Sequence, residues 1–151
     1  MKLEIKGDEV LPADQETVWL RLNDPEFLTL CVPGCKAMEL TGEDAYRVEI
    51  QLSVASVSGG FDGHIALSDK QPPEACSITV KGEGSLGHGT GTARFTLTAG
   101  EDGTTRIDYL GEGEIGGLVA GVGQRVLRGV SKHLIKKFFK TAKTHLAEVK
   151  V

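Results

Sequence analysis

The sequence predicts an α+β domain in which a curved antiparallel sheet of six to seven strands is crossed by one long C-terminal helix. Two observations support this class. Residues 36–114 repeatedly alternate apolar and polar side chains, which is typical of strands with one buried face. Residues 118–148 form the one long stretch with helical periodicity, and only they carry enough apolar surface to cover such a sheet. We therefore expect one domain over residues 1–151.

The N-terminal elements follow from local signals. Residues 2–11 alternate with a period of two and predict the first strand. Asp14 is expected to cap a short helix over residues 15–22. Pro25 suits the first position of a second short helix, which we expect to end at Pro33-Gly34.

The sheet is predicted from the middle of the chain. Its clearest strand surrounds Tyr46, Val48 and Ile50, which alternate with charged and polar residues. Turn signals at residues 41–44, 71–74 and 100–103 separate the later strands. Consecutive strands joined by short turns predict an antiparallel meander with one apolar face. That face is expected to pack against Val119, Val122, Val126, Val130 and Leu134 of the C-terminal helix.

Glycine is abundant, with 20 residues, whereas aromatic residues make up only 5% of the chain. Gly82, Gly84, Gly111 and Gly113 are in phase with the apolar side chains of their strands and are expected on the inner face. Glycine within a strand often marks a bulge or a close approach of backbone or ligand. Two interpretations stay open: these glycines leave room for a guest, or they let the sheet bend and the helix pack closely.

Charge is distributed very unevenly. Residues 121–151 carry a formal charge of +7, whereas the first 120 residues carry −11. This asymmetry predicts an anionic partner for the basic segment. Ile135, Phe139 and Leu146 are expected beside the cations, away from the sheet, as in a helix lying on an anionic membrane. Alternatively, Phe138 and Phe139 pack against the N-terminal helices and the lysines are solvated, or the helix neutralises the acidic body.

The sequence does not predict a catalytic or metal site. His64 falls on the polar phase of its strand, and His88 lies in a glycine-rich, turn-like segment. His133 and His145 are twelve residues apart, not at the spacing of a paired helical metal site. A nucleic-acid partner is not expected, because the body is acidic and the pI is about 5.6.

Cys31 and Cys35 flank a Pro-Gly turn in the segment CVPGC. A redox pair, half of a metal site, and a partner contact are the functional interpretations. We favour a structural one, in which two small, partly buried side chains hold the turn against the body. The odd number of cysteines, together with the absence of a secretory signal or a membrane span, predicts a cytoplasmic protein.

The order of these elements resembles the helix-grip, START-like superfamily, also called SRPBCC. Within it, the chain is similar to the family of the G subunit of carbon monoxide dehydrogenase. The likeness rests on Val18 and Trp19 in the first helix, on Asp24-Pro25-Glu26, on CVPGC, and on the glycine-rich hairpin before the last helix. It covers essentially the whole chain.

The resemblance implies a non-enzymatic protein that binds a lipophilic ligand, a quinone or other lipid, without a covalent cofactor. It would serve a molybdenum hydroxylase of the carbon monoxide dehydrogenase type, in the cytoplasm or peripherally at the inner face of the cell membrane. The ligand is expected to contact Phe61, Ile65, Val80, Phe95, Tyr109, Ile115, Val119, Val122, Val126 and Val130. The membrane or partner is expected to contact Arg125, Arg128, Lys132, Lys136, Phe139, Lys140 and Lys143.

Tyr109 is the expected polar contact to a carbonyl of the ligand. Two other function classes stay open. One is a cyclase or hydrolase acting on a hydrophobic substrate in the same cavity, which would depend on Tyr109 or His64. The other is an assembly factor that binds no ligand.

Overall fold

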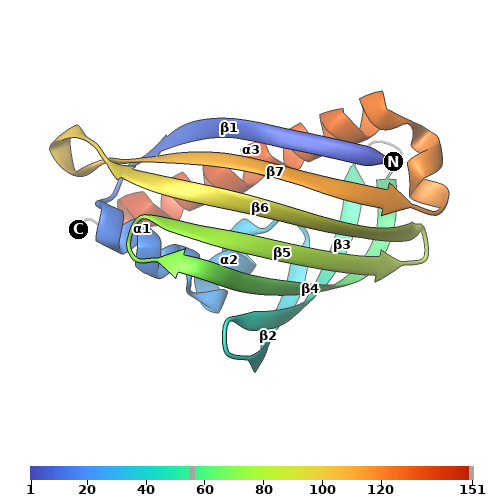
Figure 1. The fold of residues 1–151 in the computed structure, drawn as a ribbon, viewed down its shortest axis with the longest axis horizontal. Coiled ribbons are helices and arrows are strands. Elements are labelled where there is room, and N and C mark those ends of the chain that lie inside the picture. Colours follow the sequence, from blue (N-terminus) through green and yellow to red (C-terminus); the bar gives the residue numbers. More distant parts are fainter. Residues whose placement is uncertain (55–56, 150–151) are drawn as a thin grey trace.

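The computed structural model describes the backbone of residues 1–54 and 57–149, and the side chains of these residues up to 147. The described chain forms a seven-stranded antiparallel sheet with three α-helices (Figure 1). The strands are β1 (Lys2–Leu11), β2 (Cys35–Gly42), β3 (Ala45–Val54), β4 (Val57–Gln71), β5 (Ala75–Gly84), β6 (Gly87–Ala99) and β7 (Thr105–Gly116). The helices are α1 (Gln15–Leu22), α2 (Pro25–Cys31) and α3 (Gln124–Val149), with short 3₁₀ turns η1 (Glu101–Gly103) and η2 (Leu118–Val122). The predicted α+β class is confirmed.

The sheet has the strand order β1-β7-β6-β5-β4-β3-β2. Strands β2 to β7 form a meander, and β1 extends it by pairing with β7. The two edge strands of the open sheet are therefore β1 and β2. In Figure 1, α3 runs along one side of the sheet near β1, and α1 and α2 lie at the end of the sheet where the C-terminus lies. This arrangement is the helix grip that the resemblance implied.

The two short helices begin where their capping residues predict. The Asp14 side chain accepts a hydrogen bond of 2.8 Å from the Thr17 backbone N–H, which satisfies a donor left free in the first turn of α1. Asp24 accepts one of 3.0 Å from Glu26 in the same way, and Pro25 occupies the first turn of α2. Because these interactions are local, both helices could be predicted from the sequence.

The predicted C-terminal helix was too long at its start. Residues 118–122 form the separate turn η2, and α3 begins only at Gln124. Gly123 lies between them at φ +96, a left-handed conformation that interrupts a right-handed helix. The Val119 backbone N–H donates to the Leu86 carbonyl at 2.6 Å, so η2 is attached to the β5–β6 turn. Val119 and Val122 therefore do not belong to the apolar stripe of α3.

The buried residues form two clusters rather than one core. The first cluster joins α1, α2 and the C-terminal half of α3 to the sheet, and it contains Trp19, Phe27, Phe95, Phe139 and Leu146. The second lies at the other end of the molecule, where Leu3, Val57, Leu127 and Val130 are buried. The stretch of sheet between the two clusters is the place to look for a binding site.

Candidate binding site on the concave face

The cross-strand register identifies the inner face of the sheet between the clusters. Gly91 of β6 lies opposite Val80 of β5 and Gly113 of β7, and Gly113 lies opposite Leu3 of β1. Leu3 is buried in the second cluster, so this whole row faces α3. The neighbouring residues of the same face are found two positions along each strand.

Glycines occupy most of the inner face in this region. Gly82 lies opposite both Gly63 and Gly89, which places three glycines side by side across β4, β5 and β6. We call six of the inward-facing glycines the glycine floor; they are Gly63, Gly82, Gly89, Gly91, Gly111 and Gly113. The floor interrupts the apolar side chains that would otherwise join the two clusters.

Val80 shows that the floor is open. It is in phase with the buried Cys76 on the same strand, yet 40% of its surface is exposed. An apolar side chain on the inner face of a sheet is normally covered by the opposing layer. The inner face of the sheet, which is its concave face, is therefore uncovered beside Val80 and Gly82.

The two interpretations of the inward glycines apply to different positions. A Cβ atom at Gly82 would have only ordinary contacts, the nearest being the Asp62 carbonyl oxygen at 3.8 Å. At Gly111 it would lie 3.0 Å from the Ala93 Cβ, and at Gly113 it would lie 2.9 Å from the Thr90 carbonyl oxygen. At Gly84 it would lie 2.8 Å from the Phe61 ring. Gly82 leaves space, whereas the other three allow close packing.

The predicted ligand contacts are divided between the two clusters. Ile65, Phe95 and Tyr109 belong to the first cluster or pack against it. Phe61, Ile115, Val119, Val122 and Val130 belong to the second cluster or pack against it. They form two apolar walls at the ends of the glycine floor, with Val80 between them.

Val126, a predicted contact to the sheet and the ligand, has 37% of its surface exposed. Leu127, which the prediction missed, is buried instead together with Val130. The spacing of Leu127, Val130 and Leu134 is the signal that would have identified the buried stripe. Val119 and Val122, which the prediction placed on the same helical stripe, are separated from α3 by the turn at Gly123.

Tyr109 projects toward β1 rather than over the glycine floor. Its ring stacks on Phe139, with centroids 5.6 Å apart and an interplanar angle of 24°. A Cβ at Gly7 of β1 would overlap the Tyr109 hydroxyl, so this hydroxyl lies directly above Gly7. Desolvation, followed by the nearby carboxylates of Glu9 and Asp8, raises the pKa of Tyr109. The hydroxyl is thus a neutral donor at the β1 side of the molecule.

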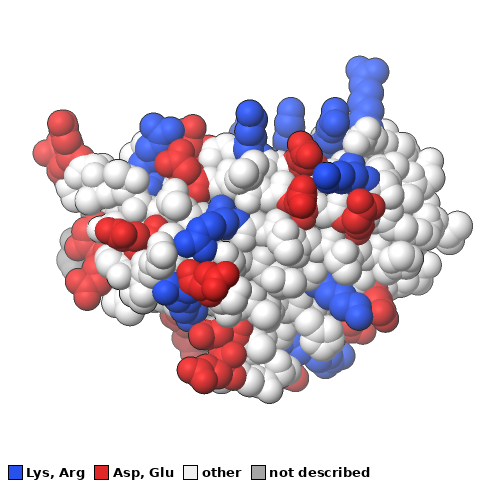
Figure 2. Space-filling view, viewed as in Figure 1, with Lys and Arg blue, Asp and Glu red and all other residues white. Residues whose placement is uncertain are grey.

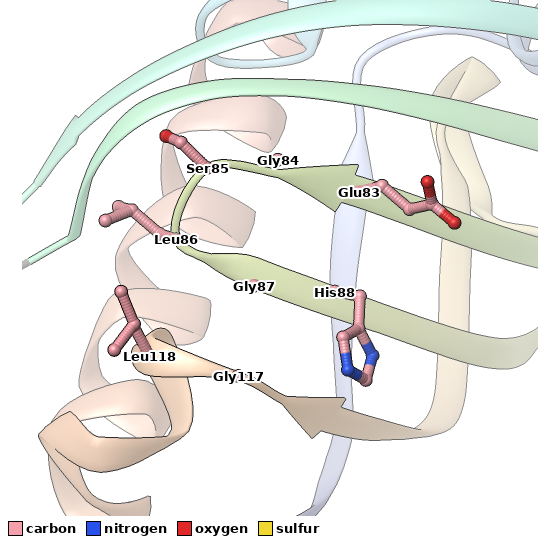
Figure 3. Close-up of a pocket in the computed structure, with 8 residues that line it drawn as sticks. All are labelled: Glu83, Gly84, Ser85, Leu86, Gly87, His88, Gly117 and Leu118. Atoms are coloured by element: carbon pink, nitrogen blue, oxygen red, sulfur yellow. The ribbon is translucent and has the colours of Figure 1, made fainter.

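A second hollow lies at the end of the sheet, between the β5–β6 turn and the start of η2 (Figure 3). It has a volume of about 380 Å³ and includes Leu86, Leu118 and His88 in its lining. Leu118 is 76% exposed. His88 lies in strand β6, not in a turn as its glycine-rich context suggested. His64 is exposed on the outer face, opposite Lys81, and therefore cannot reach a ligand on the concave face.

The thiols are poorly suited to redox or metal chemistry. Cys31 ends α2 and is 2% exposed, and this burial raises the pKa of its thiol to about 11. Desolvation also raises the pKa values of the Cys35 and Cys76 thiols. Thiolate is the reactive and metal-binding form of cysteine. The environment therefore supports the structural interpretation, and the described residues contain no group of three metal-ligating side chains.

The exposed side of α3 is cationic, and among the described residues of this helix Val126 is the one exposed large hydrophobic side chain. Figure 2 shows a row of basic side chains along the edge of the molecule where α3 and β1 lie in Figure 1. Arg125, Arg128, Lys132, Lys136 and Lys140 are exposed, as a contact surface requires. Lys143 is half-buried and forms an ion pair with Glu9.

The prediction that Phe139 and Leu146 project away from the sheet is wrong. They are only 6% and 1% exposed. Both belong to the first cluster, with Trp19 of α1 and Phe27 of α2. For Phe139, this is the packing against the N-terminal helices that the alternative interpretation predicted. The reason is that α3 is covered by the sheet along its first half and also by α1 and α2 along its second half. Among the described residues, no helix is long and apolar enough to cross a membrane.

Comparisons with known proteins agree with this geometry. A family model described as the G subunit of carbon monoxide dehydrogenase (CoxG) matches residues 7–147. A conserved protein from Geobacillus kaustophilus, known by its crystal structure, is 39% identical with a TM-score of 0.94, and the match covers 97% of this chain and 96% of that one. The search of curated proteins found no match.

More distant structures share the fold. A START superfamily protein from Mycobacterium smegmatis is 13% identical with a TM-score of 0.74, and the match covers 97% of this chain and 98% of that one. A norcoclaurine synthase point mutant from Thalictrum flavum, in complex with a transition state analogue, is 11% identical with a TM-score of 0.70 over 100% and 98% of the two chains. The fold is therefore START-like, although fold alone does not assign an activity.

Proposed function

Because the chain belongs to the CoxG family, that of the G subunit of carbon monoxide dehydrogenase, we propose that it is an accessory protein of a molybdenum hydroxylase of that type. It binds a lipophilic molecule on the concave face, over the glycine floor. The ligand class is an isoprenoid quinone, whose ring carbonyls accept hydrogen bonds and whose prenyl chain is apolar. The protein would deliver this electron acceptor to the enzyme or hold the enzyme near the membrane.

One observation carries the ligand proposal: the inner face carries no side chain at six adjacent positions, and Val80 beside them is 40% exposed. Apolar walls bound the floor at both ends. Burying apolar surface contributes about 25 cal/mol per Å², so about 200 Å² of prenyl contact would contribute about 5 kcal/mol. A ligand can therefore be held without a charged site.

Gly82→Leu is the sharpest test, because a Cβ at Gly82 has more room than one at any other floor position, with its nearest atom 3.8 Å away. The added leucine should occupy the site and weaken binding of a benzoquinone carrying one prenyl unit by about tenfold or more, measured by equilibrium dialysis. Thr79→Leu is the matched control, because Thr79 is exposed on the outer face of the same strand. Equal affinity of Gly82→Leu and the unmodified protein would contradict binding over the floor.

The alternative of an enzyme in the same cavity would have to depend on Tyr109, because His64 lies on the outer face. Turnover of a hydrophobic substrate that Tyr109→Phe abolishes would favour it. The alternative of an assembly factor without a ligand predicts that native mass spectrometry finds no prenyl compound with the protein. The open region beside Val80 favours ligand binding over an assembly factor without a ligand.

A further inference from the structure

A short flap closes the end of the concave face that lies away from the C-terminus (Figure 1). We use this name for residues Gly117–Gly123, which are η2 with one glycine on each side. Val119 and Val122 of the flap pack against the second cluster, as Ile115 does. Ile115 lies directly opposite Gly89 of the glycine floor. The flap therefore completes the apolar wall at this end of the proposed ligand site.

Glycine occupies both ends of the flap. Gly117 has φ +86 and Gly123 has φ +96, backbone conformations that residues with a side chain rarely adopt. A Cβ at Gly123 or at Gly121 would have no atom within 4 Å, so this side of the flap is not packed against the body. The hinges of moving loops are a few residues at the ends of an element that absorb a change in φ and ψ. The two end glycines meet this requirement.

Few interactions hold the flap to the sheet. Among the described residues, one backbone hydrogen bond joins η2 to the sheet or its turns, and it is the 2.6 Å bond from the Val119 N–H to the Leu86 carbonyl oxygen. The backbone bonds donated by Ala120 and Gly123 stay within the flap. A segment with few hydrogen bonds to its surroundings opens at a lower free-energy cost than the strands beside it.

The chain around the flap carries no charge. Residues 50–61, 84–93 and 115–124 contain no Lys, Arg, Asp or Glu, although these four types make up 25% of the protein. The three segments surround the β3–β4 connection, the β5–β6 turn and the flap. In Figure 2 the surface is uncharged at the right-hand end of the molecule, where the β5–β6 turn and η2 lie in Figure 1.

These uncharged segments touch one another. A Cβ at Gly59 of β4 would lie 3.2 Å from the Leu86 Cδ1 atom, and one at Gly87 would lie 3.0 Å from the Val119 Cγ1 atom. Leu118 at the start of the flap is 76% exposed. An apolar molecule that passed between the flap and the β5–β6 turn would therefore meet apolar side chains and backbone, and no ionised group.

We propose that the flap is a lid through which the ligand enters and leaves the concave face. Rotation about Gly117 and Gly123 breaks the Val119–Leu86 hydrogen bond and moves Val119 and Val122 away from the second cluster, which opens this end of the site. The lid rests on the proposed function, because it serves the ligand over the glycine floor. The competing route is the gap between β1 and α3, beside Ile5.

A reversible cross-link tests the lid. Leu86→Cys with Leu118→Cys places one thiol on the β5–β6 turn and one on the flap, both lining the hollow in Figure 3. A short bis-thiosulfonate reagent joins the two thiols and locks the flap, and reduction frees it again. Capping both thiols with a methyl thiosulfonate is the matched control, since it adds bulk without a link. Cys35→Ser removes the one native thiol that is not buried.

Stopped-flow binding of a benzoquinone carrying one prenyl unit gives the rate constants in each form. The signal is the fluorescence of Trp19, the single tryptophan, whose ring centroid lies 6.2 Å from that of Phe95. The linked form should bind and release the quinone about tenfold more slowly than the capped and reduced forms, with Kd unchanged within about twofold. A lid alters the barrier between the free and bound states but neither state itself, so both rate constants fall by the same factor.

The outcomes separate the lid from the proposed function. Equal rate constants in the linked and capped forms would overturn the lid and leave quinone binding standing, with entry between β1 and α3. A linked form that loses affinity would show that the flap is a fixed part of the wall. Absence of quinone binding in every form would contradict the proposed function, and the lid with it.

Hydrogen exchange in the unmodified, ligand-free protein tests the opening itself. The Val119 amide should have a protection factor at least about tenfold lower than the hydrogen-bonded amides of β6, because local opening of the flap frees it without unfolding the sheet. Equal protection of Val119 and β6 would mean that the flap opens only when the whole domain unfolds, and would overturn the lid.

Discussion

Phe139 of α3 stacks on Tyr109 of β7, with ring centroids 5.6 Å apart. The pair joins the middle of the long helix to the sheet. Phe138 meets Phe139 edge-on at 5.3 Å, which extends the contact. The stack is part of the first cluster, which packs α3 against the sheet.

Phe139→Ala should be strongly destabilising. Removing a buried aromatic side chain leaves a cavity and costs about 3–5 kcal/mol in the free energy of unfolding. Phe138→Ala should cost less, because Phe138 is only partly buried. Urea denaturation measures both values. A loss below about 1 kcal/mol for Phe139→Ala would contradict its place in the core.

The Glu9–Lys143 ion pair should contribute little stability despite its 2.7 Å distance. Its side chains are 30% and 42% exposed, so water screens the attraction. A double-mutant cycle with Glu9→Gln and Lys143→Met should give a coupling energy of about 1 kcal/mol or less, which falls as salt is added. A coupling of about 3 kcal/mol that is insensitive to salt would show a desolvated pair instead.

The CVPGC turn should depend on Gly34. This residue has φ +75, and a Cβ there would overlap the Gln51 carbonyl oxygen. The Gly34 carbonyl oxygen also accepts a 2.9 Å hydrogen bond from the Gln51 backbone N–H, so β3 approaches the turn closely. Gly103 is a matched control, because it has φ +72 and a Cβ added there would have no atom within 4 Å.

Gly103→Ala should cost about 1 kcal/mol from backbone strain alone. Gly34→Ala should cost clearly more, because the clash is added to the strain. Thermal and urea unfolding of the two variants would measure the difference. Equal losses would mean that the turn can move away from β3 at no cost.

Stability should fall at high pH because of the buried thiol of Cys31. Its pKa is raised from about 9 to about 11 in the folded protein, so the unfolded chain releases this proton first. Between about pH 9 and 11 the folded state binds more protons, and the free energy of unfolding therefore decreases as the pH rises. Cys31→Ala should show a smaller decrease over this range. An identical decrease in both proteins would show that Cys31 does not cause it.

The exposed cations of α3 predict an electrostatic contact with membranes. Binding to vesicles should rise with the fraction of anionic lipid and weaken as salt is added. The reason is that the cations make the contact by charge alone, since Phe139 and Leu146 are buried and cannot insert into the membrane. Co-sedimentation with vesicles of increasing phosphatidylglycerol content measures this. Equal binding to neutral vesicles would require an apolar contact elsewhere, such as the exposed Leu118.

Much of the fold was determined by the sequence itself. Alternation along each strand places Tyr46 and Val48 on the inner face, and capping by Asp14 and Asp24 starts the short helices. These signals act between residues close together in the chain, so a single sequence contains them. Even the inward phase of Gly82 could be predicted in this way.

Only the tertiary structure decided which of these faces meet. The alignment of Gly63, Gly82 and Gly89 depends on the register of three strands, and the burial of Phe139 depends on the rotation of α3 against α1, α2 and the sheet. Periodicity defines a face of an element but not its partner. Long-range packing, cross-strand register and the turn at Gly123 selected the partners, and thereby created an open concave face from residues distant in the chain.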